Sequence, residues 1–306
     1  MKKKYKVILC ILILLIFSGC TKVLRDKENK PITYETTGQN ITENILCRPT
    51  DEEVIKIYND NDIDISKLPE CVEFKINQGG YEGLWNSFFV RPLSWFIIKV
   101  GSIFGNYGLA LIIVSIVIRL MMYPATKGTA LQSERMKKAQ PDLDIIEKKY
   151  KDKKNQEDTM KKSQEIMAVY KKNNINPLSG CLFAFLQLPI FFAFLEAINR
   201  TPAIFEGNFL FYQLGTTPFV AIQNGQYHYF ILIILLVLLT HLSFKLNKTA
   251  SMNSDSQKQM AFMSKIMLVF ITIASFTLST AISIYWISSS AFTILQNQIV
   301  KRSKIV

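Results

Sequence analysis

The 306-residue sequence lacks the short motifs that hold metals and nucleotides. It contains no zinc-ligand spacing, no P-loop and no dinucleotide-binding fingerprint. It also lacks the internal repeat and the paired, glycine-interrupted spans that are common in transporters. No catalytic nucleophile stands out. We therefore expect no cofactor, no metal site and no enzymatic activity.

Charged residues are scarce over several long apolar runs, and hydrophobic residues make up 49% of the chain. These runs approach the length that crosses a bilayer, so the sequence predicts an all-α membrane protein. The net charge of +12 is unevenly spread: residues 125–176 hold 13 Lys/Arg against 8 Asp/Glu, whereas residues 21–92 hold 9 against 13. Lys and Arg collect in cytoplasmic loops, so we interpret the charge as topology and expect no nucleic-acid sequence recognition.

The amino terminus is typical of a secretory signal peptide, with lysines before a short apolar core. The core ends in Phe17-Ser18-Gly19-Cys20, which resembles a bacterial lipobox, although Phe17 replaces the usual leucine. We expect cleavage after residue 19 and lipid modification of Cys20; the alternative is an uncleaved signal anchor. Cys47 and Cys71 both fall in the segment expected outside the cell, and the sequence leaves open whether they pair.

The remaining chain divides into five expected spans and the segments between them. The spans are 106–124, 177–199, 228–246, 261–281 and 282–300. The other segments are an external polar stretch at 20–83, an interfacial amphipathic helix at 84–105, a cytoplasmic helical hairpin at 125–176, an external loop at 200–227, a cytoplasmic loop at 247–260 and a cytoplasmic tail at 301–306. The external stretch is either a spacer or a small module.

We expect the two hairpin helices at residues 128–150 and 157–172. Their apolar stripe is thin and is formed by Leu131, Met136, Leu143, Ile146, Met160, Ile166, Met167 and Tyr170. The hairpin is therefore either a mobile docking arm or a merely solvated charged pair.

One arginine, Arg119, stands inside the apolar run from Leu109 to Met122. A guanidinium stays charged, and placing Arg at a helix centre in lipid costs roughly 2.5–3.5 kcal/mol even on the mildest scale. Arg119 lies five residues before Pro124, so its side chain can reach the nearer membrane surface. The alternative is a hydrated interior site.

Polar residues in the expected spans favour the interior site. Ser283, Trp286, Ser290, Thr293 and Asn297 recur at spacings of three and four, so they share one helical face. Ser115 lies four residues before Arg119, and Gln187 adds a polar group from the second span. Hydrogen bonding between helices would explain such residues as well, but three polar faces together predict a shared hydrated cavity.

Several short stretches resemble the YidC/Oxa insertase family, in its lipoprotein form from Gram-positive or related bacteria. In chain order they are Asn106-Tyr107-Gly108, Ile118-Arg119-Leu120 with Tyr123-Pro124, Gln140-Pro141, Tyr170-Lys171-Lys172 with Asn176-Pro177-Leu178, Gln187-Leu188-Pro189-Ile190-Phe191, and Tyr285-Trp286 leading to Gln296. Their order and spacing over residues 84–299 carry the resemblance. Ser279-Thr280-Ala281 departs from the family's usual Pro-Ala-Gly.

The resemblance implies five core spans around a hydrophilic groove that opens to the cytoplasm and to lipid. Arg119 matches the groove arginine, Gln187 and Trp286 match groove-lining positions, and the hairpin matches the part that receives substrate. The implied function is insertion and folding of nascent membrane proteins in the bacterial plasma membrane, with the Sec translocon, the ribosome and membrane lipids as partners. The competing hypotheses are a small-solute or anion transporter and a structural membrane lipoprotein scaffold.

Overall fold

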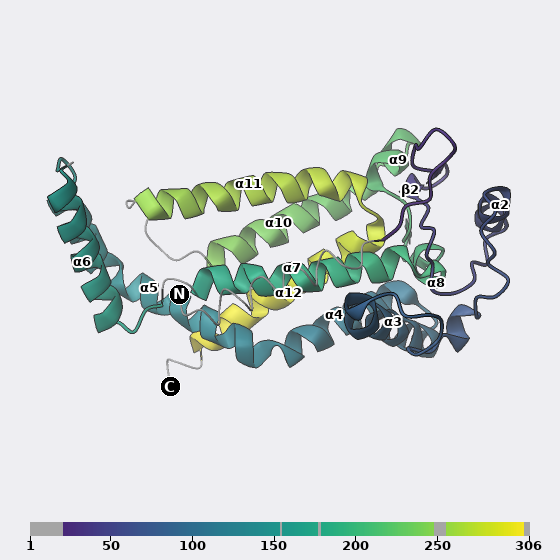
Figure 1. Cartoon of the computed structure of the whole chain (residues 1–306). Helices are drawn as coiled ribbons and strands as arrows, with labels where there is room; N and C mark the ends of the chain where they lie inside the picture. Colours follow the sequence, from purple (N-terminus) through teal and green to yellow (C-terminus); the bar gives the residue numbers. More distant parts are fainter. Residues whose placement is uncertain (1–20, 154, 177–178, 248–254, 303–306) are drawn as a thin grey trace. The chain divides into compact units, whose positions relative to one another are not determined.

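A computed structural model describes residues 21–153, 155–176, 179–247 and 255–302 (Figure 1). The expected signal peptide at 1–19, the lipidation site Cys20 and most of the tail at 301–306 lie outside these residues. The described chain is mostly helical and forms two compact units. The first contains the described residues up to Val117, then Leu188–Leu236 and Ala274–Ser288; the second contains Ile118–Gln187, Val237–Ile273 and the residues from Ser289 on.

The polar stretch that we expect outside the cell is a folded module within the first unit. It contains the antiparallel strands β1 (Thr33–Tyr34) and β2 (Gln39–Asn40), the helix α2 (Glu52–Asp60) and the 3-10 turn η1 (Cys71–Glu73). The Asp51 side chain caps α2 by accepting hydrogen bonds from the backbone N–H groups of Glu53 and Val54. Buried apolar residues form its core: Leu24, Ile41, Ile45, Val54, Tyr58, Ile65 and Phe205.

A disulfide joins Cys47 to Cys71 across this module, with a Cα–Cα distance of 4.8 Å. The sequence had left this pairing open, because spacing alone does not tell whether two cysteines meet. It had also left open whether residues 20–83 form a spacer or a module. A core, a helix cap and a disulfide identify the described residues of this segment as a module.

The module is joined to the loop between α7 (Ser179–Asn199) and α10 (Tyr229–Asn247). That loop contains α8 (Pro202–Phe205), β3 (Asn208–Phe209), β4 (Tyr212–Gln213) and α9 (Pro218–Gln223). Backbone hydrogen bonds run from Thr217 N to Thr37 O at 2.7 Å and from Leu46 N to Arg200 O at 2.8 Å. Gly38, at φ 71°, permits this approach, because a Cβ there would collide with the side chain of Val220.

The stretch expected to be an interfacial helix forms the π-helical turn η2 (Asn86–Val90) followed by α3 (Arg91–Phe104). Gly105, at φ 63°, ends α3 in the left-handed conformation. One side of α3 is buried in the first unit, and the other exposes large apolar residues. By length and composition Asn86–Phe104 is apolar enough to cross a membrane, which the sequence analysis had not expected.

The later helices overlap the expected spans, most closely at α7, α10 and α12. They are α7 (Ser179–Asn199), α10 (Tyr229–Asn247), α11 (Asp255–Thr277) and α12 (Thr280–Arg302). Among the described residues only Asn86–Phe104 and Tyr229–Leu246 are long and apolar enough on their own to cross a membrane; α4 (Tyr107–Met121) joins them if it is counted together with Thr126–Lys149. Gln187–Asn199 and Lys265–Thr277 are shorter apolar helices, so the count of five spans stays a prediction.

The short turn between α11 and α12 is held by the loop between α7 and α10. The backbone N–H groups of Thr280 and Ala281 donate to the carbonyl oxygens of Thr216 and Leu214, at 3.0 and 2.8 Å. The Thr280 hydroxyl also donates to Thr216 O at 2.8 Å. These bonds fix the start of α12, at the place where the sequence departs from Pro-Ala-Gly.

The predicted hairpin lies in the second unit as α5 (Tyr123–Lys149) and α6 (Gln156–Lys172), with α6 packed against α5 (Figure 1). The expected start of its first helix at residue 128 is wrong. Pro124 occupies the first turn of α5, where a proline needs no N–H partner, so it begins a helix instead of only ending a span. Met160 and Met167 of the thin apolar stripe are both exposed.

Candidate functional site

Arg119 lies near the end of α4, and its side chain is directed at groups from two other helices. The residue is 7% exposed. Its Nε donates to the Ser289 hydroxyl of α12 at 2.9 Å, and one terminal nitrogen donates to Oε1 of Gln187 on α7 at 2.6 Å. A terminal nitrogen makes a second, short hydrogen bond to the same Ser289 hydroxyl. All three residues belong to the second unit.

The two partners suit a buried guanidinium. Removing a charged group from water is costly unless its donors are hydrogen-bonded, and the hydroxyl and amide oxygens meet that need. The Gln187 and Ser289 oxygens are neutral acceptors, and their hydrogen bonds orient the guanidinium. Snorkelling, in contrast, requires the head group to extend to the membrane surface.

A second polar contact lies in the same unit. Nε2 of Gln296 on α12 donates to the Thr126 hydroxyl of α5 at 2.8 Å, and both residues are buried. Polar side chains from four helices take part in these contacts within the second unit. They are Arg119 of α4, Thr126 of α5, Gln187 of α7, and Ser289 and Gln296 of α12.

The predicted stripe on α12 divides between the two units. Ser290, Thr293 and Asn297 belong to the second, where Ser290 and Thr293 are buried. The Thr293 hydroxyl donates to Ser289 O and the Asn297 amide to Thr293 O, each at 2.9 Å. These two bonds run along the helix itself.

Ser283, Trp286 and Ser115 belong to the first unit. Ser283 is buried, and Trp286 is half-buried with its ring edge against Phe191 of α7, at a centroid distance of 4.9 Å. Ser115 is buried, and its hydroxyl has no hydrogen-bond partner among the described residues. A buried hydroxyl without a partner costs about 1–3 kcal/mol unless water reaches it.

Ser289, whose hydroxyl accepts hydrogen bonds from Arg119, was not among the predicted site residues. The predicted stripe included Ser290, the next residue in the run Ser288-Ser289-Ser290, in place of Ser289. A neighbouring line through Trp286, Ser289, Thr293 and Gln296 has equally good helical spacing. Periodicity alone does not choose between two lines that lie about one residue apart around a helix.

The described residues include no group of three or more His, Cys, Asp or Glu side chains placed to bind a metal.

The comparisons with known proteins cover most of the chain. The family model described as 60Kd inner membrane protein matches residues 99–305. Three similar proteins are the membrane protein insertase YidC of Oceanobacillus iheyensis (38% identical over 226 residues, 72% of this chain and 85% of that protein), the membrane protein insertase YidC of Alkalihalophilus pseudofirmus (36% over 218 residues, 70% and 81%) and the membrane protein insertase MisCA of Bacillus subtilis (35% over 218 residues, 71% and 79%).

These matches confirm the resemblance that the short motifs had indicated. The match begins within α3 and takes in every later element, including the helices that carry Arg119, Gln187 and Ser289. The amino-terminal module precedes it. The chain belongs to the 60Kd inner membrane protein family, the YidC/Oxa family of bacterial membrane proteins.

Proposed function

We propose that this protein is a membrane protein insertase, which inserts and helps fold newly made integral membrane proteins. Two observations support the proposal. The chain belongs to a family whose members of similar length carry that name, and its Arg119 is held among neutral hydrogen-bonding groups from α7 and α12. The second observation carries the mechanism, because it fixes a positive charge within a polar interior.

In the proposed mechanism, an acidic tail of the substrate enters a hydrated groove from the cytoplasm and meets Arg119. Two opposite charges 4 Å apart attract by about 4 kcal/mol at an effective dielectric constant of 20, against about 1 kcal/mol in water. Gln187 and Ser289 hold the guanidinium in place, and the polar face of α12 with Ser283, Ser290, Thr293 and Asn297 hydrates the tail. Transfer of the adjoining apolar segment into lipid supplies the driving force, so no covalent step is required.

We further propose that the amino-terminal module lies outside the cell and that α5 and α6 lie in the cytoplasm. The disulfide supports the first placement, because structural disulfides persist in oxidising compartments. The net positive charge of residues 125–176 supports the second. Under this topology Cys20 carries the lipid anchor, the carboxyl terminus is cytoplasmic, and the hairpin receives substrates from the ribosome or the Sec translocon.

The decisive experiment compares two substrates that differ only in the charge of the translocated tail. In cells that depend on this protein, Arg119→Ala should lower insertion of the acidic-tailed substrate by roughly tenfold or more, because a charge-assisted contact is lost. Insertion of the neutral-tailed substrate should be nearly unchanged. Arg119→Lys keeps the charge but loses the bidentate guanidinium geometry, so its insertion of the acidic-tailed substrate should be intermediate. Full activity of Arg119→Ala on the acidic tail would overturn the electrostatic role.

Cysteine labelling separates the insertase from a transporter and from a scaffold. Single cysteines at Ser283, Ser290 and Asn297 are introduced after Cys181 is replaced, while the disulfide-bonded Cys47 and Cys71 do not react with maleimide. Labelling from the cytoplasmic side alone supports a groove that is closed outside. Labelling from both sides supports a transporter path, and complete protection supports a packed scaffold.

A further inference from the structure

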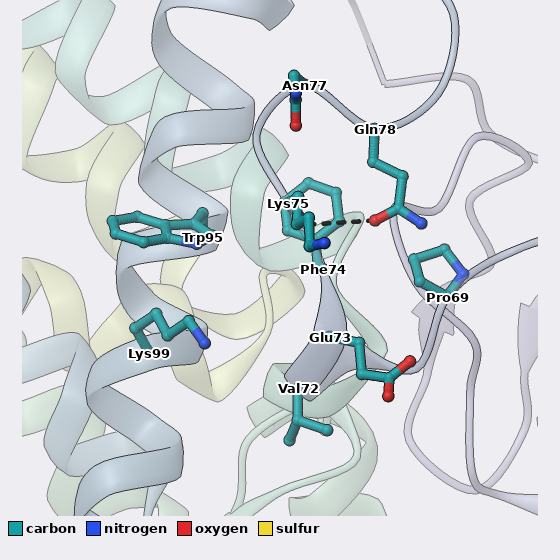
Figure 2. A pocket seen from close by; sticks show the side chains of 9 residues that line it. All are labelled: Pro69, Val72, Glu73, Phe74, Lys75, Asn77, Gln78, Trp95 and Lys99. Carbon is teal, nitrogen blue, oxygen red and sulfur yellow. Dashed lines mark hydrogen bonds between the residues drawn. The ribbon is translucent and has the colours of Figure 1, made fainter.

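A cavity of about 740 Å³ lies within the first unit, between α3 and the segment of residues 69–78 (Figure 2). Trp95 and Lys99 line it from α3, and Val72, Glu73, Lys75 and Gln78 line it from the facing segment. Figure 2 shows the Lys99 side chain extending from α3 toward that segment. The cavity lies outside the Arg119 site, and the proposed mechanism does not use it.

Both walls of the cavity are fixed. Cys71, the first residue of η1, is held by its disulfide to Cys47, and the Phe74 side chain is buried beneath the segment. The backbone N–H of Lys75 donates to Oε1 of Gln78 at 3.3 Å, which closes the turn. Beyond it, Arg91 of α3 donates to Gly80 O at 2.7 Å. A ligand would therefore meet a preformed site with little ordering cost.

The charged groups at this cavity lack partners of their own. Within the part of the chain that the structure describes, the ammonium groups of Lys75 and Lys99 and the carboxylate of Glu73 form no ion pair. Two cations and one anion leave a net charge of +1. An ammonium group is a strong donor to phosphate oxygens, so the cavity suits an anionic phosphate group better than a cation.

Apolar side chains are exposed on the same helical segment. Lys99 is four residues before Ile103, and Phe88, Ile103 and Phe104 are all exposed. Val72 of η1 is exposed beside the cavity. Trp95 shares the Lys99 side of α3, and tryptophan is enriched where apolar and polar regions of a membrane meet. The ligand therefore needs a phosphate group joined to an apolar part.

We propose that this cavity binds the headgroup of an anionic phospholipid, with the acyl chains lying along the exposed apolar side of α3. The Lys75 and Lys99 ammonium groups contact the phosphate, and the Gln78 amide and Glu73 carboxylate face the hydroxyl groups of a headgroup such as glycerol. The proposal rests on the external placement of the module and of α3 at the membrane surface. It does not require Arg119 or any step of insertion.

Native mass spectrometry of the full-length protein in detergent, titrated with phosphatidylglycerol, tests the site. The double variant Lys75→Glu/Lys99→Glu should bind the first phosphatidylglycerol with an affinity about twentyfold lower than that of the unmodified protein. Each lysine contributes roughly fivefold to the affinity for an anionic headgroup. The matched control is Lys27→Glu/Lys56→Glu, which reverses two exposed lysines of the same module away from the cavity. It should retain the lipid normally. Phosphatidylcholine should bind weakly to all three proteins.

Three results would overturn the proposal. Equal retention by the cavity variant and the control would place the lipid elsewhere. Equal retention of phosphatidylcholine would remove the anionic specificity. Displacement by millimolar glycerol 3-phosphate would show that the site takes a soluble phosphate compound. The insertion assay is run in parallel: the cavity variant should insert substrates, and Arg119→Ala should retain phosphatidylglycerol, so failure of either proposal is seen separately.

Discussion

The amino-terminal module and the helical hairpin are two small folded parts of the same chain, and different interactions stabilise them. The module closes a 24-residue separation with a disulfide and is bordered by ion pairs of buried arginines. The hairpin has no disulfide among its described residues; a short apolar core and several exposed ion pairs join α5 to α6. One part is held rigidly, and the other is held by contacts that are individually weak.

The ionic contacts at the edge of the module join two buried arginine side chains to a partly exposed carboxylate. The Glu82 carboxylate accepts from Arg200 at 2.6 Å and pairs with Arg91 at 3.4 Å, while the Arg200 and Arg91 side chains are 1% and 7% exposed. Arg200 Nε also donates to Asn44 O at 2.6 Å, and Trp85 donates to Glu196 at 2.9 Å. This group links the module, the segment before α3 and the end of α7 within the first unit.

The hairpin core is small in comparison. Met136, Ala139, Leu143 and Ile175 are buried, and Ile166, Val169 and Tyr170 pack against them. The Lys149 ammonium and the Tyr150 hydroxyl both bind Glu165, at 2.6 and 2.9 Å, and these hydrogen bonds hold the pKa of Glu165 below its usual value. Contacts of this kind open at a lower free energy than a disulfide-bonded core does.

The largest effect should follow removal of Glu82. Glu82→Ala removes the carboxylate that both buried arginines contact, and leaving a buried charge uncompensated costs about 3–5 kcal/mol. Thermal unfolding of the full chain, together with release of the module by trypsin, measures the loss. Glu28→Ala is the control, because Glu28 pairs with Lys30 on the exposed surface. An equally small change in both variants would refute the structural role of the buried group.

Removing the disulfide should cost slightly less. For a loop of about 25 residues, loss of the cross-link destabilises by about 3 kcal/mol in the chain-entropy treatment. Cys47→Ser/Cys71→Ser should therefore lower the unfolding temperature of the module and leave hydrogen exchange in α5 and α6 unchanged. A reductant should reproduce the effect in the unmodified protein only. If the hairpin responded equally, the two parts would not be independent.

Truncation in the hairpin core should have a smaller, local effect. Leu143→Ala removes the main buried side chain between α5 and α6, at a cost of about 2 kcal/mol, because the loosely packed site can partly collapse. Hydrogen exchange over residues 134–172 should accelerate while the module keeps its protection. Ile145→Ala, on the same helix but exposed, is the control. Slower or unchanged exchange in Leu143→Ala would contradict the assignment of this core.

Two neighbouring lysines of α6 give the smallest and sharpest test. Lys162 pairs with Glu147 of α5 at 3.0 Å, with side chains 22% and 11% exposed; Lys161 pairs with Glu157 at 2.7 Å, with side chains 56% and 76% exposed. Lys162→Ala should cost about 1 kcal/mol because it leaves a buried carboxylate. Lys161→Ala should cost less than about 0.5 kcal/mol. Equal hydrogen exchange in the two variants would remove burial as the reason.

Periodicity and charge predicted the helices well, but not the contacts between them. The bounds of α7, α10 and α12 lie within a few residues of the expected spans, because the charged segments on either side of a long apolar run restrict where its helix begins and ends. Pro124 was misjudged because proline both ends a helix and begins one, and only the backbone on either side decides which. Met160 and Met167 fit an apolar stripe, yet α5 covers only part of α6.

By itself the sequence determined the membrane class, the family, the candidate arginine and Gln187 as a polar group in the second span, since composition, charge and motif order are local properties of the chain. The tertiary structure decided that Cys47 pairs with Cys71, that Ser289 is the serine bound to Arg119, and that Lys75 and Lys99 face one cavity. Each of these depends on how residues distant in sequence approach one another. Helical spacing fixes the face on which a residue lies, whereas packing against other elements selects its partner.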